Sequence, residues 1–139
     1  MTAHIAVRHI DGDAFSIDVR GHVVHVDQPV DAGGADTAPT PTELFIAGLA
    51  SCVAFYARRY LVRHDISTDG FAVNASYAMT GRPARVSSVR IQITPPDALP
   101  DERRAAFLAV ASHCTVHNSL EQPPDVDVHL DAARTVYSR

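Results

Sequence analysis

The feature that most constrains this sequence is the apolar stretch from Leu44 to Leu61, which follows a clear helix-start signal. Thr40, Pro41 and Glu43 supply an N-cap hydroxyl, a proline at the first helical position and the glutamate of a capping box. Apolar side chains lie on almost every face of the predicted helix, with small residues interleaved among them. A helix of this kind is buried on most sides, so we predict that it forms the centre of the fold.

Segments that alternate apolar and polar residues lie on both sides of this helix. They cover residues 5–10, 15–19 and 23–26 before it, and residues 71–79, 86–94 and 126–130 after it. Turn residues separate neighbouring segments, as in Asp11-Gly12-Asp13 and Gly81-Arg82-Pro83. The pattern predicts short strands joined in hairpins, with a Gly- and Pro-rich loop over residues 29–39.

Two further helical segments complete the predicted secondary structure. Asp101 and Glu102 place acids in the first turn of a helix that runs to about His113, and residues 114–120 form one or two more turns. Strands grouped in hairpins, rather than alternating singly with helices, favour an α+β fold with antiparallel pairing. Because 139 residues is an ordinary size for one domain, we expect a single domain over residues 1–139.

Composition excludes several function classes. The net charge is -4 and the basic residues are scattered, so no stripe suited to nucleic-acid phosphates is present. The first ten residues contain His4, Arg8 and His9 and no long apolar run, which argues against a signal peptide or a membrane span there. We therefore expect a cytoplasmic protein without nucleic-acid or membrane partners. The sequence also lacks the Gly-x-Ser-x-Gly elbow of serine hydrolases and the glycine pattern of nucleotide-binding loops.

The sequence has two cysteines, Cys52 and Cys114, which are too few for a secreted disulfide framework. Each is either a packing residue or a reactive thiol. Cys52 lies about three turns inside the long helix, so a reactive thiolate there needs a cation from elsewhere, and an arginine is the natural candidate. Cys114 lies between two helical segments beside His113 and His117, and this setting predicts that Cys114 ionises more easily than Cys52.

The same cluster permits a zinc site as an alternative. His113, Cys114 and His117, together with Cys52, would provide four nitrogen and sulfur ligands. Adjacent residues rarely point at one ion, however, and no Cys-x-x-Cys spacing is present. The zinc site is therefore the less favoured of the two interpretations.

Three segments together resemble the OsmC/Ohr family, named for osmotically induced protein C and organic hydroperoxide resistance. They are Arg20-Gly21-His22 leading to Val26-Asp27-Gln28-Pro29, the helix start and small residues from Pro39 to Cys52, and His113-Cys114-Thr115-Val116-His117 with Asn118-Ser119-Leu120. The resemblance implies an intertwined homodimer in which antiparallel sheets wrap around central cysteine-bearing helices, with active sites at the subunit interface.

The resemblance also implies roles for individual residues. Cys52 would be the peroxidatic thiol and Cys114 the resolving thiol, and Arg20, or less well Arg8, would supply the activating cation. No metal or organic cofactor would be needed. The organic-hydroperoxide members place a glutamate where this chain has Thr42, and Glu43 stands one residue over. One position turns a side chain by roughly 100° around a helix, so Glu43 serves either as the partner of that arginine or only in the capping box.

The leading hypothesis is a thiol-dependent peroxidase that reduces organic hydroperoxides or peroxide with a thiol reductant, in defence against oxidative stress. The alternative is a redox-sensing or small-ligand-binding protein on the same dimeric scaffold, without turnover. Contact between the sulfurs of Cys52 and Cys114, with an arginine beside Cys52, would favour the peroxidase.

Overall fold

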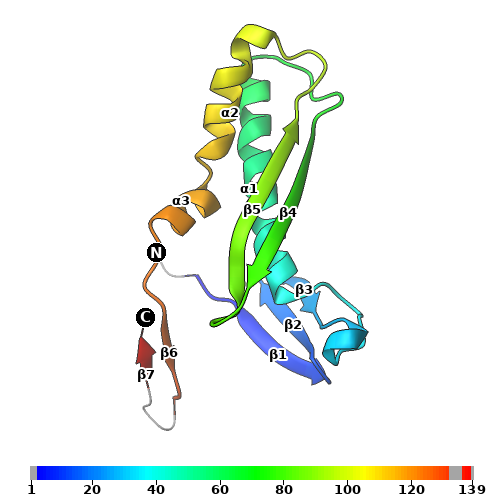
Figure 1. The fold of residues 1–139 in the computed structure, drawn as a ribbon, viewed down its shortest axis with the longest axis vertical. Coiled ribbons are helices and arrows are strands. Elements are labelled where there is room, and N and C mark those ends of the chain that lie inside the picture. Colours follow the sequence, from blue (N-terminus) through cyan, green and yellow to red (C-terminus); the bar gives the residue numbers. More distant parts are fainter. Residues whose placement is uncertain (1–2, 132–135, 139) are drawn as a thin grey trace. The chain divides into compact units, whose positions relative to one another are not determined.

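The computed structural model describes residues 3–131 and 136–138, which form two compact units. One unit comprises Met1–Gly48 and Ala75–Ile91, and the other comprises Leu49–Asn74 and Gln92–Arg139. The elements in chain order are β1 (Ala6–Asp11), β2 (Ala14–Val19), β3 (His22–Val26), η1 (Val30–Ala32), α1 (Pro41–Arg63), β4 (Ala72–Thr80), β5 (Arg85–Thr94), η2 (Asp101–Arg103), α2 (Arg104–Ser112), α3 (Thr115–Glu121), β6 (Asp127–His129) and β7 (Val136–Ser138). Figure 1 labels the helices and strands. The α+β class with antiparallel pairing is confirmed.

The first unit contains a three-stranded antiparallel sheet in the order β1-β2-β3. Ile17 is paired with Val7 on one side and with Val24 on the other. The turn between β2 and β3 places Arg20 at φ 55° and Gly21 at φ 85°, the left-handed region that hairpin turns require. The three strands that alternation predicted are therefore present, each within about one residue of its expected bounds.

A buried carboxylate organises the loop after β3. Asp27 is 1% exposed, and its carboxylate accepts hydrogen bonds from the backbone N–H of Gln28 (2.7 Å) and from the N–H and Oγ1 of Thr37 (3.0 and 2.7 Å). These hydrogen bonds hold the pKa of Asp27 below its ordinary value. Asp27 thereby closes the loop up to Thr37, in the segment 29–39 for which composition predicted no regular structure, and η1 forms inside it.

The predicted capping box starts α1. The Thr40 N–H donates to Oε1 of Glu43 (2.8 Å), and the Glu43 N–H donates to Oγ1 of Thr40 (3.0 Å). The helix buries one stripe of side chains at helical spacing, which are Ile46, Leu49, Val53, Ala57, Tyr60 and Leu61. Of the described helices, α1 is long and apolar enough to span a membrane by length and composition, but the buried stripe is that of a core helix.

The prediction that α1 is buried on most sides is wrong for the single chain. Phe45, Phe55 and Val62 are exposed, Phe55 to 53%. One stripe of α1 packs against the chain's own core, and the opposite apolar face is open to solvent.

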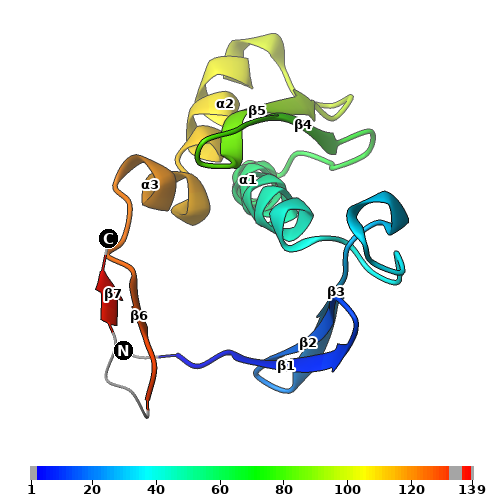
Figure 2. The ribbon, with the colours of Figure 1, turned by 60° about the horizontal axis from the view of Figure 1, so that its bottom comes forward.

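In the second unit α2 lies alongside the C-terminal half of α1, as Figures 1 and 2 both show. Aromatic rings join the two helices, because Phe107 contacts Tyr60 edge-to-face at 5.8 Å and Phe71 at 6.3 Å between centroids. Leu61 and Ala111 are fully buried beside them. These residues form the core against which the second half of α1 packs.

Two hairpins complete the described structure. β4 and β5 form a two-stranded sheet, as predicted, and β6 pairs antiparallel with β7. The predicted strand over residues 126–130 is shorter, at Asp127–His129, and its partner β7 was not predicted. Three residues are too few to show an alternating pattern, which explains why the sequence did not indicate β7.

Candidate thiol site

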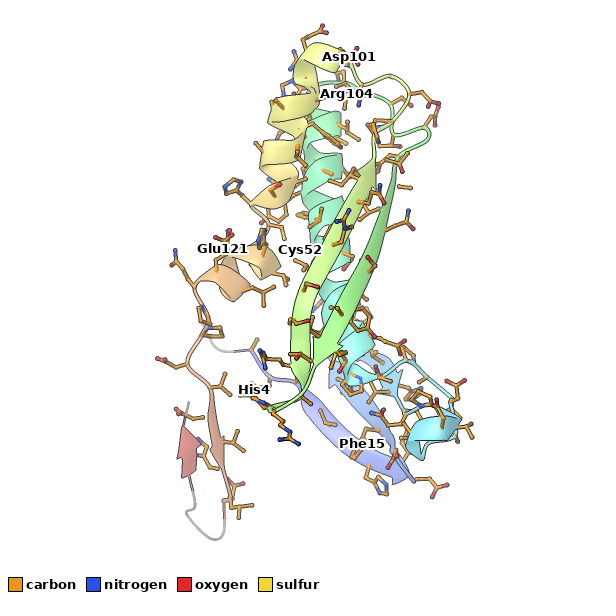
Figure 3. All side chains as sticks on the ribbon, in the orientation of Figure 1. His4, Phe15, Cys52, Asp101, Arg104 and Glu121 are labelled. Carbon is orange, nitrogen blue, oxygen red and sulfur yellow. The ribbon has the colours of Figure 1, made fainter. Side chains whose placement is uncertain are left out.

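Cys52 and Cys114 come together in the second unit. Cys52 lies in the middle of α1 (Figure 3) and is half-buried, whereas Cys114 immediately precedes α3 and is 0% exposed. Both are free thiols. The Cys52 side chain lies near enough to Cys114 to raise the pKa of the Cys114 thiol. The fold therefore brings the two sulfurs together from segments that are distant in the sequence.

Burial is the largest influence on Cys114. It raises the pKa of the Cys114 thiol, and the neighbouring Cys52 raises that pKa further, whereas the backbone N–H groups of His117 and Val116 lower it. The net pKa lies above the ordinary thiol value. The expected lowering of the Cys114 pKa by the helix start and the neighbouring imidazoles is therefore not found, because desolvation outweighs the backbone N–H groups that lower this pKa.

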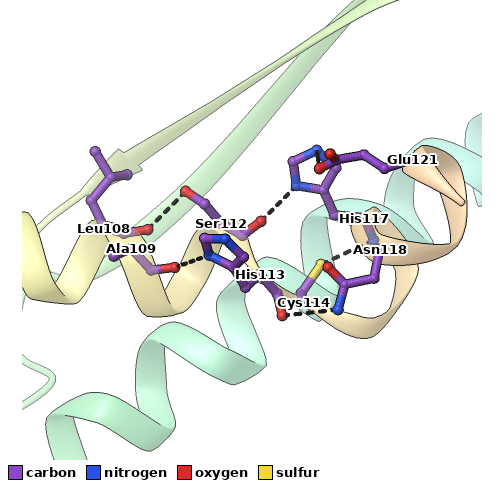
Figure 4. A network of polar contacts seen from close by, with 8 residues as sticks. All are labelled: Leu108, Ala109, Ser112, His113, Cys114, His117, Asn118 and Glu121. Atoms are coloured by element: carbon purple, nitrogen blue, oxygen red, sulfur yellow. Dashed lines mark hydrogen bonds and ion pairs between the residues drawn. The ribbon is translucent and has the colours of Figure 1, made fainter.

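The two histidines around Cys114 are directed elsewhere, as Figure 4 shows. His113 Nδ1 contacts the carbonyl oxygen of Ala109 at 2.7 Å, and His117 Nδ1 donates to the carbonyl oxygen of Ser112 at 2.6 Å. His117 Nε2 lies 3.2 Å from a carboxylate oxygen of Glu121. These contacts fix the junction between α2 and α3 rather than placing an imidazole beside the thiol.

The backbone holds the Cys114 sulfur in place. Cys114 is the N-cap residue of α3, and its Sγ accepts a hydrogen bond from the His117 N–H at 3.3 Å. A thiol that accepts a backbone hydrogen bond in this way replaces the usual capping hydroxyl or carboxylate. The sulfur is therefore part of the helix start as well as a neighbour of Cys52.

Sequence reasoning missed a hydrogen bond between the two cysteine-bearing elements. The Tyr56 hydroxyl and Oγ1 of Thr115 are 2.7 Å apart, across 59 residues of sequence. The available signal was spacing, because Tyr56 stands one turn after Cys52 and Thr115 directly follows Cys114. The guanidinium of Arg59 lies 5.9 Å from the centre of the Tyr56 ring.

Arg20 and Glu43 belong to the first unit. Arg20 occupies the turn between β2 and β3, where the Gly21 N–H donates to Oδ1 of Asp18 at 3.1 Å. Glu43 is engaged with Thr40 in the capping box. Within the second unit, the Arg103 guanidinium donates to the Tyr60 hydroxyl (3.4 Å) and to His64 Nδ1 (2.9 Å).

The alternative zinc site is not assembled in the part of the chain that the structure describes. Among residues 3–131 and 136–138, no three His, Cys, Asp or Glu side chains are gathered around a position that could hold a metal ion. His113 and His117 instead contact backbone carbonyls of α2.

Solved structures of similar fold are numerous. A structure from Psychrobacter arcticus, described as an osmotic stress induced and detoxification response protein, is 29% identical, with a TM-score of 0.77 over 86% of this chain and 88% of that chain. An organic hydroperoxide resistance protein OsmC from Legionella pneumophila is 19% identical, with a TM-score of 0.67 over 86% and 89%. The organic hydroperoxide resistance protein OhrB of Bacillus subtilis is 19% identical, with a TM-score of 0.63 over 88% and 93%.

Family membership follows from the sequence itself. A search of curated proteins gave no match. The sequence model of the family described as OsmC-like protein matches residues 33–129, which include α1 with Cys52 and the segment around Cys114. Because this match covers more than half of the chain and agrees with the fold, the chain belongs to the OsmC-like protein family.

Proposed function

We propose that this chain is a thiol-dependent peroxidase that reduces organic hydroperoxides or peroxide through Cys52 and Cys114 and takes part in oxidative-stress defence. The observation that carries the proposal is that two free thiols from distant parts of the sequence are neighbours in the second unit. Family membership and the fold shared with two organic hydroperoxide resistance proteins support the choice of substrate class.

The two thiols differ in exposure and in pKa, and this difference supports different roles for them in the reaction. Cys52 is half-buried and thus accessible to a small peroxide, whereas Cys114 is fully buried and its pKa is raised. The first nucleophile must meet substrate as a thiolate. We therefore assign the first attack to Cys52 and the resolving step to Cys114.

The proposed reaction has three steps. The Cys52 thiolate attacks the terminal oxygen of the hydroperoxide, and the O–O bond breaks. Cys52 becomes a sulfenic acid, and the departing alkoxide takes a proton from solvent and leaves as an alcohol. The Cys114 thiolate attacks the Cys52 sulfur, so that an S–S bond forms and hydroxide leaves as water with the Cys114 proton. An external dithiol finally reduces the disulfide by exchange and is itself oxidised. No metal or organic cofactor takes part.

A cation is needed to keep Cys52 ionised, and Arg20 is our proposed candidate. The positive φ of Arg20 fixes it in the tight turn between β2 and β3, at the position that best matches the family motif. Glu43 is the proposed carboxylate partner of Arg20, although its carboxylate also accepts the Thr40 N–H. Any pairing with Arg20 must therefore share Glu43 with the capping box.

We propose a cytoplasmic homodimer in which each chain forms a single OsmC-like domain. Large apolar side chains are exposed on elements throughout the single chain, including Phe45, Phe55 and Val62 on α1, Leu108 on α2 and Val7 on β1. Exposure on this scale is unusual for a chain that remains monomeric. A second copy of the chain is the occupant that the family resemblance favours.

The alternative is a redox sensor or small-ligand-binding protein on the same scaffold. One observation favours it: Thr42 stands where the hydroperoxide members have a glutamate, and Glu43 is already engaged in the capping box. If no carboxylate fully holds the activating arginine in place, the first oxidation of Cys52 would be slower, but a disulfide could still form. Slow oxidation with little turnover is the behaviour of a sensor.

The test is consumption of an organic hydroperoxide at neutral pH with a dithiol reductant. Cys52→Ser is expected to abolish consumption, and Cys114→Ser, its matched control that also lacks one thiol, is expected to allow one oxidation per chain and then stop. Wild-type turnover with kcat/KM above about 10⁴ M⁻¹s⁻¹ would indicate a peroxidase rather than a sensor. Equal consumption by wild type and Cys52→Ser would refute the proposal.

A further inference from the structure

The hydrogen bond between Tyr56 and Thr115 connects the two elements that carry the thiols. Tyr56 stands one turn after Cys52, so both side chains project from the same side of α1. Thr115 follows Cys114 and is the first residue of α3. At 2.7 Å the contact has the ordinary length of a good hydroxyl–hydroxyl hydrogen bond.

The position of α3 relative to α1 depends on few contacts. α3 has seven residues, and only His113 and Cys114 separate it from α2. A helix this short has little stability of its own and takes its place from the side chains that anchor it. The buried Cys114 side chain is one anchor, and the Thr115 hydroxyl, held by Tyr56, is another.

The Tyr56 ring is itself restrained. Phe55 meets it edge-to-face at 5.3 Å between ring centroids, and the Arg59 guanidinium lies over it at 5.9 Å. The phenol group therefore has little freedom to turn away from α3. Because Thr115 is β-branched and helical, its χ1 rotation is restricted as well.

A disulfide has narrow geometric requirements. Its two Cα atoms must lie about 4.4–6.8 Å apart, with the Cβ vectors directed toward each other. The hydrogen bond between Tyr56 and Thr115 lies one turn from Cys52 and one residue from Cys114. It therefore limits how far α3 can move away from α1. Such a contact raises the effective concentration of one thiol at the other, as a short linker does between two binding groups.

We infer that Tyr56 and Thr115 are positioning residues for the Cys52–Cys114 pair, which hold the two sulfurs in disulfide-forming arrangement and so set how readily the disulfide forms. The inference rests on the proposed function, because it assumes that these two thiols form a disulfide. The hydroxyl groups of Tyr56 and Thr115 would then act in the resolving step, in which Cys114 attacks Cys52. The first oxidation of Cys52 does not depend on them.

The variants Tyr56→Phe and Thr115→Val remove one hydroxyl each and keep the size of the side chain. Thr115→Ser keeps the hydroxyl and is the rescue variant. Tyr60→Phe is the matched control, because Tyr60 is the tyrosine one turn further along α1 and its hydroxyl accepts from Arg103 rather than from α3. Each chain is equilibrated in mixtures of reduced and oxidised dithiothreitol, and the fraction of disulfide is measured by thiol alkylation and mass spectrometry.

Loss of either hydroxyl is expected to lower the equilibrium constant for disulfide formation about fivefold, which is the net contribution of one hydrogen bond. This change corresponds to a shift of about 20 mV in the reduction potential of the disulfide. The double variant is expected to lose no more than either single variant, because both remove the same contact. Thr115→Ser and Tyr60→Phe are expected to match wild type. In single-turnover experiments the disulfide is expected to form about fivefold more slowly, whereas first oxidation in a Cys114→Ser background is unchanged.

Two outcomes separate this inference from the function on which it rests. If wild type forms the disulfide and Tyr56→Phe and Thr115→Val form it equally well, the positioning role is overturned and the peroxidase proposal stands. If wild type forms no Cys52–Cys114 disulfide under any dithiothreitol ratio, both fail. If Tyr60→Phe also lowered the equilibrium constant for disulfide formation fivefold, the effect would come from the general stability of α1. This result would also overturn the positioning role.

Discussion

The Cys114 thiol is buried at the start of α3 and interacts directly with the Cys52 thiol in the middle of α1. A negative charge on Cys52 disfavours a negative charge on Cys114, which is one cause of the raised pKa of Cys114. Oxidation of Cys52 to a neutral sulfenic acid removes that charge. We therefore expect the pKa of Cys114 to fall when its thiolate is needed, which would order the two steps of the proposed reaction.

This ordering predicts the effect of removing Cys52. In Cys52→Ala the pKa of Cys114 is expected to be lower than in wild type, because Cys52 is one cause of its elevation, but to stay above the ordinary thiol value because burial persists. The pH dependence of alkylation at Cys114 and of thiolate absorbance measures both values. Ser119→Ala, which removes a hydroxyl of α3 bonded to the Thr115 carbonyl oxygen, is the control. An unchanged pKa in Cys52→Ala would contradict the coupling.

Burial of Cys114 also predicts how stability depends on alkaline pH. The folded chain keeps the proton where the unfolded chain releases it, so the contribution to stability is fully present below the ordinary value of 9.0 and is lost as pH rises through the higher pKa of the folded state. The sequence contains no lysine, so few other side chains titrate in this range. Urea unfolding above pH 9.0 is expected to show a smaller loss of stability in Cys114→Ala than in wild type. If the free energy of unfolding fell equally with pH in wild type and in Cys114→Ala, this prediction would be refuted.

Local sequence signals predicted the elements that local interactions determine. The capping box of Thr40 and Glu43 marked the start of α1, and alternation with turn residues marked the strands of both hairpin groups. These signals work because the interactions involve residues only a few positions apart. They place the two cysteines on their elements.

Properties that depend on distant segments were not predictable in the same way. The burial of Cys114 and its contact with Cys52 depend on how α1, α2 and α3 pack, and no local pattern records that packing. The same holds for the hydrogen bond between Tyr56 and Thr115, which joins residues 59 positions apart. The open apolar face of α1 is a further case, because sequence hydrophobicity cannot distinguish a face covered by the same chain from one left for another.

Asp27 provides a prediction about the loop after β3. Asp27→Asn is expected to lower the melting temperature at neutral pH, because an amide presents donors where the carboxylate accepts from Gln28 and Thr37. Since the pKa of Asp27 is lowered in the folded chain, its stabilisation is present above the ordinary value of 3.8 and is lost as pH falls through the lower folded value. The difference in melting temperature should therefore shrink in acid, and a constant difference from neutral to strongly acidic pH would count against this role.

Gly48 provides a prediction about the open face of α1. A Cβ at Gly48 would meet no atom within 4 Å in the single chain, so Gly48→Ala is expected to stabilise the isolated helix turn by about 1 kcal/mol if no partner covers it. If the proposed homodimer instead buries this face of α1, Gly48→Leu will separate the dimer while leaving the helical circular dichroism intact. Sedimentation equilibrium of wild type, Gly48→Ala and Gly48→Leu distinguishes the two cases. A Gly48→Leu chain that dimerises as tightly as wild type would exclude this face from the subunit interface.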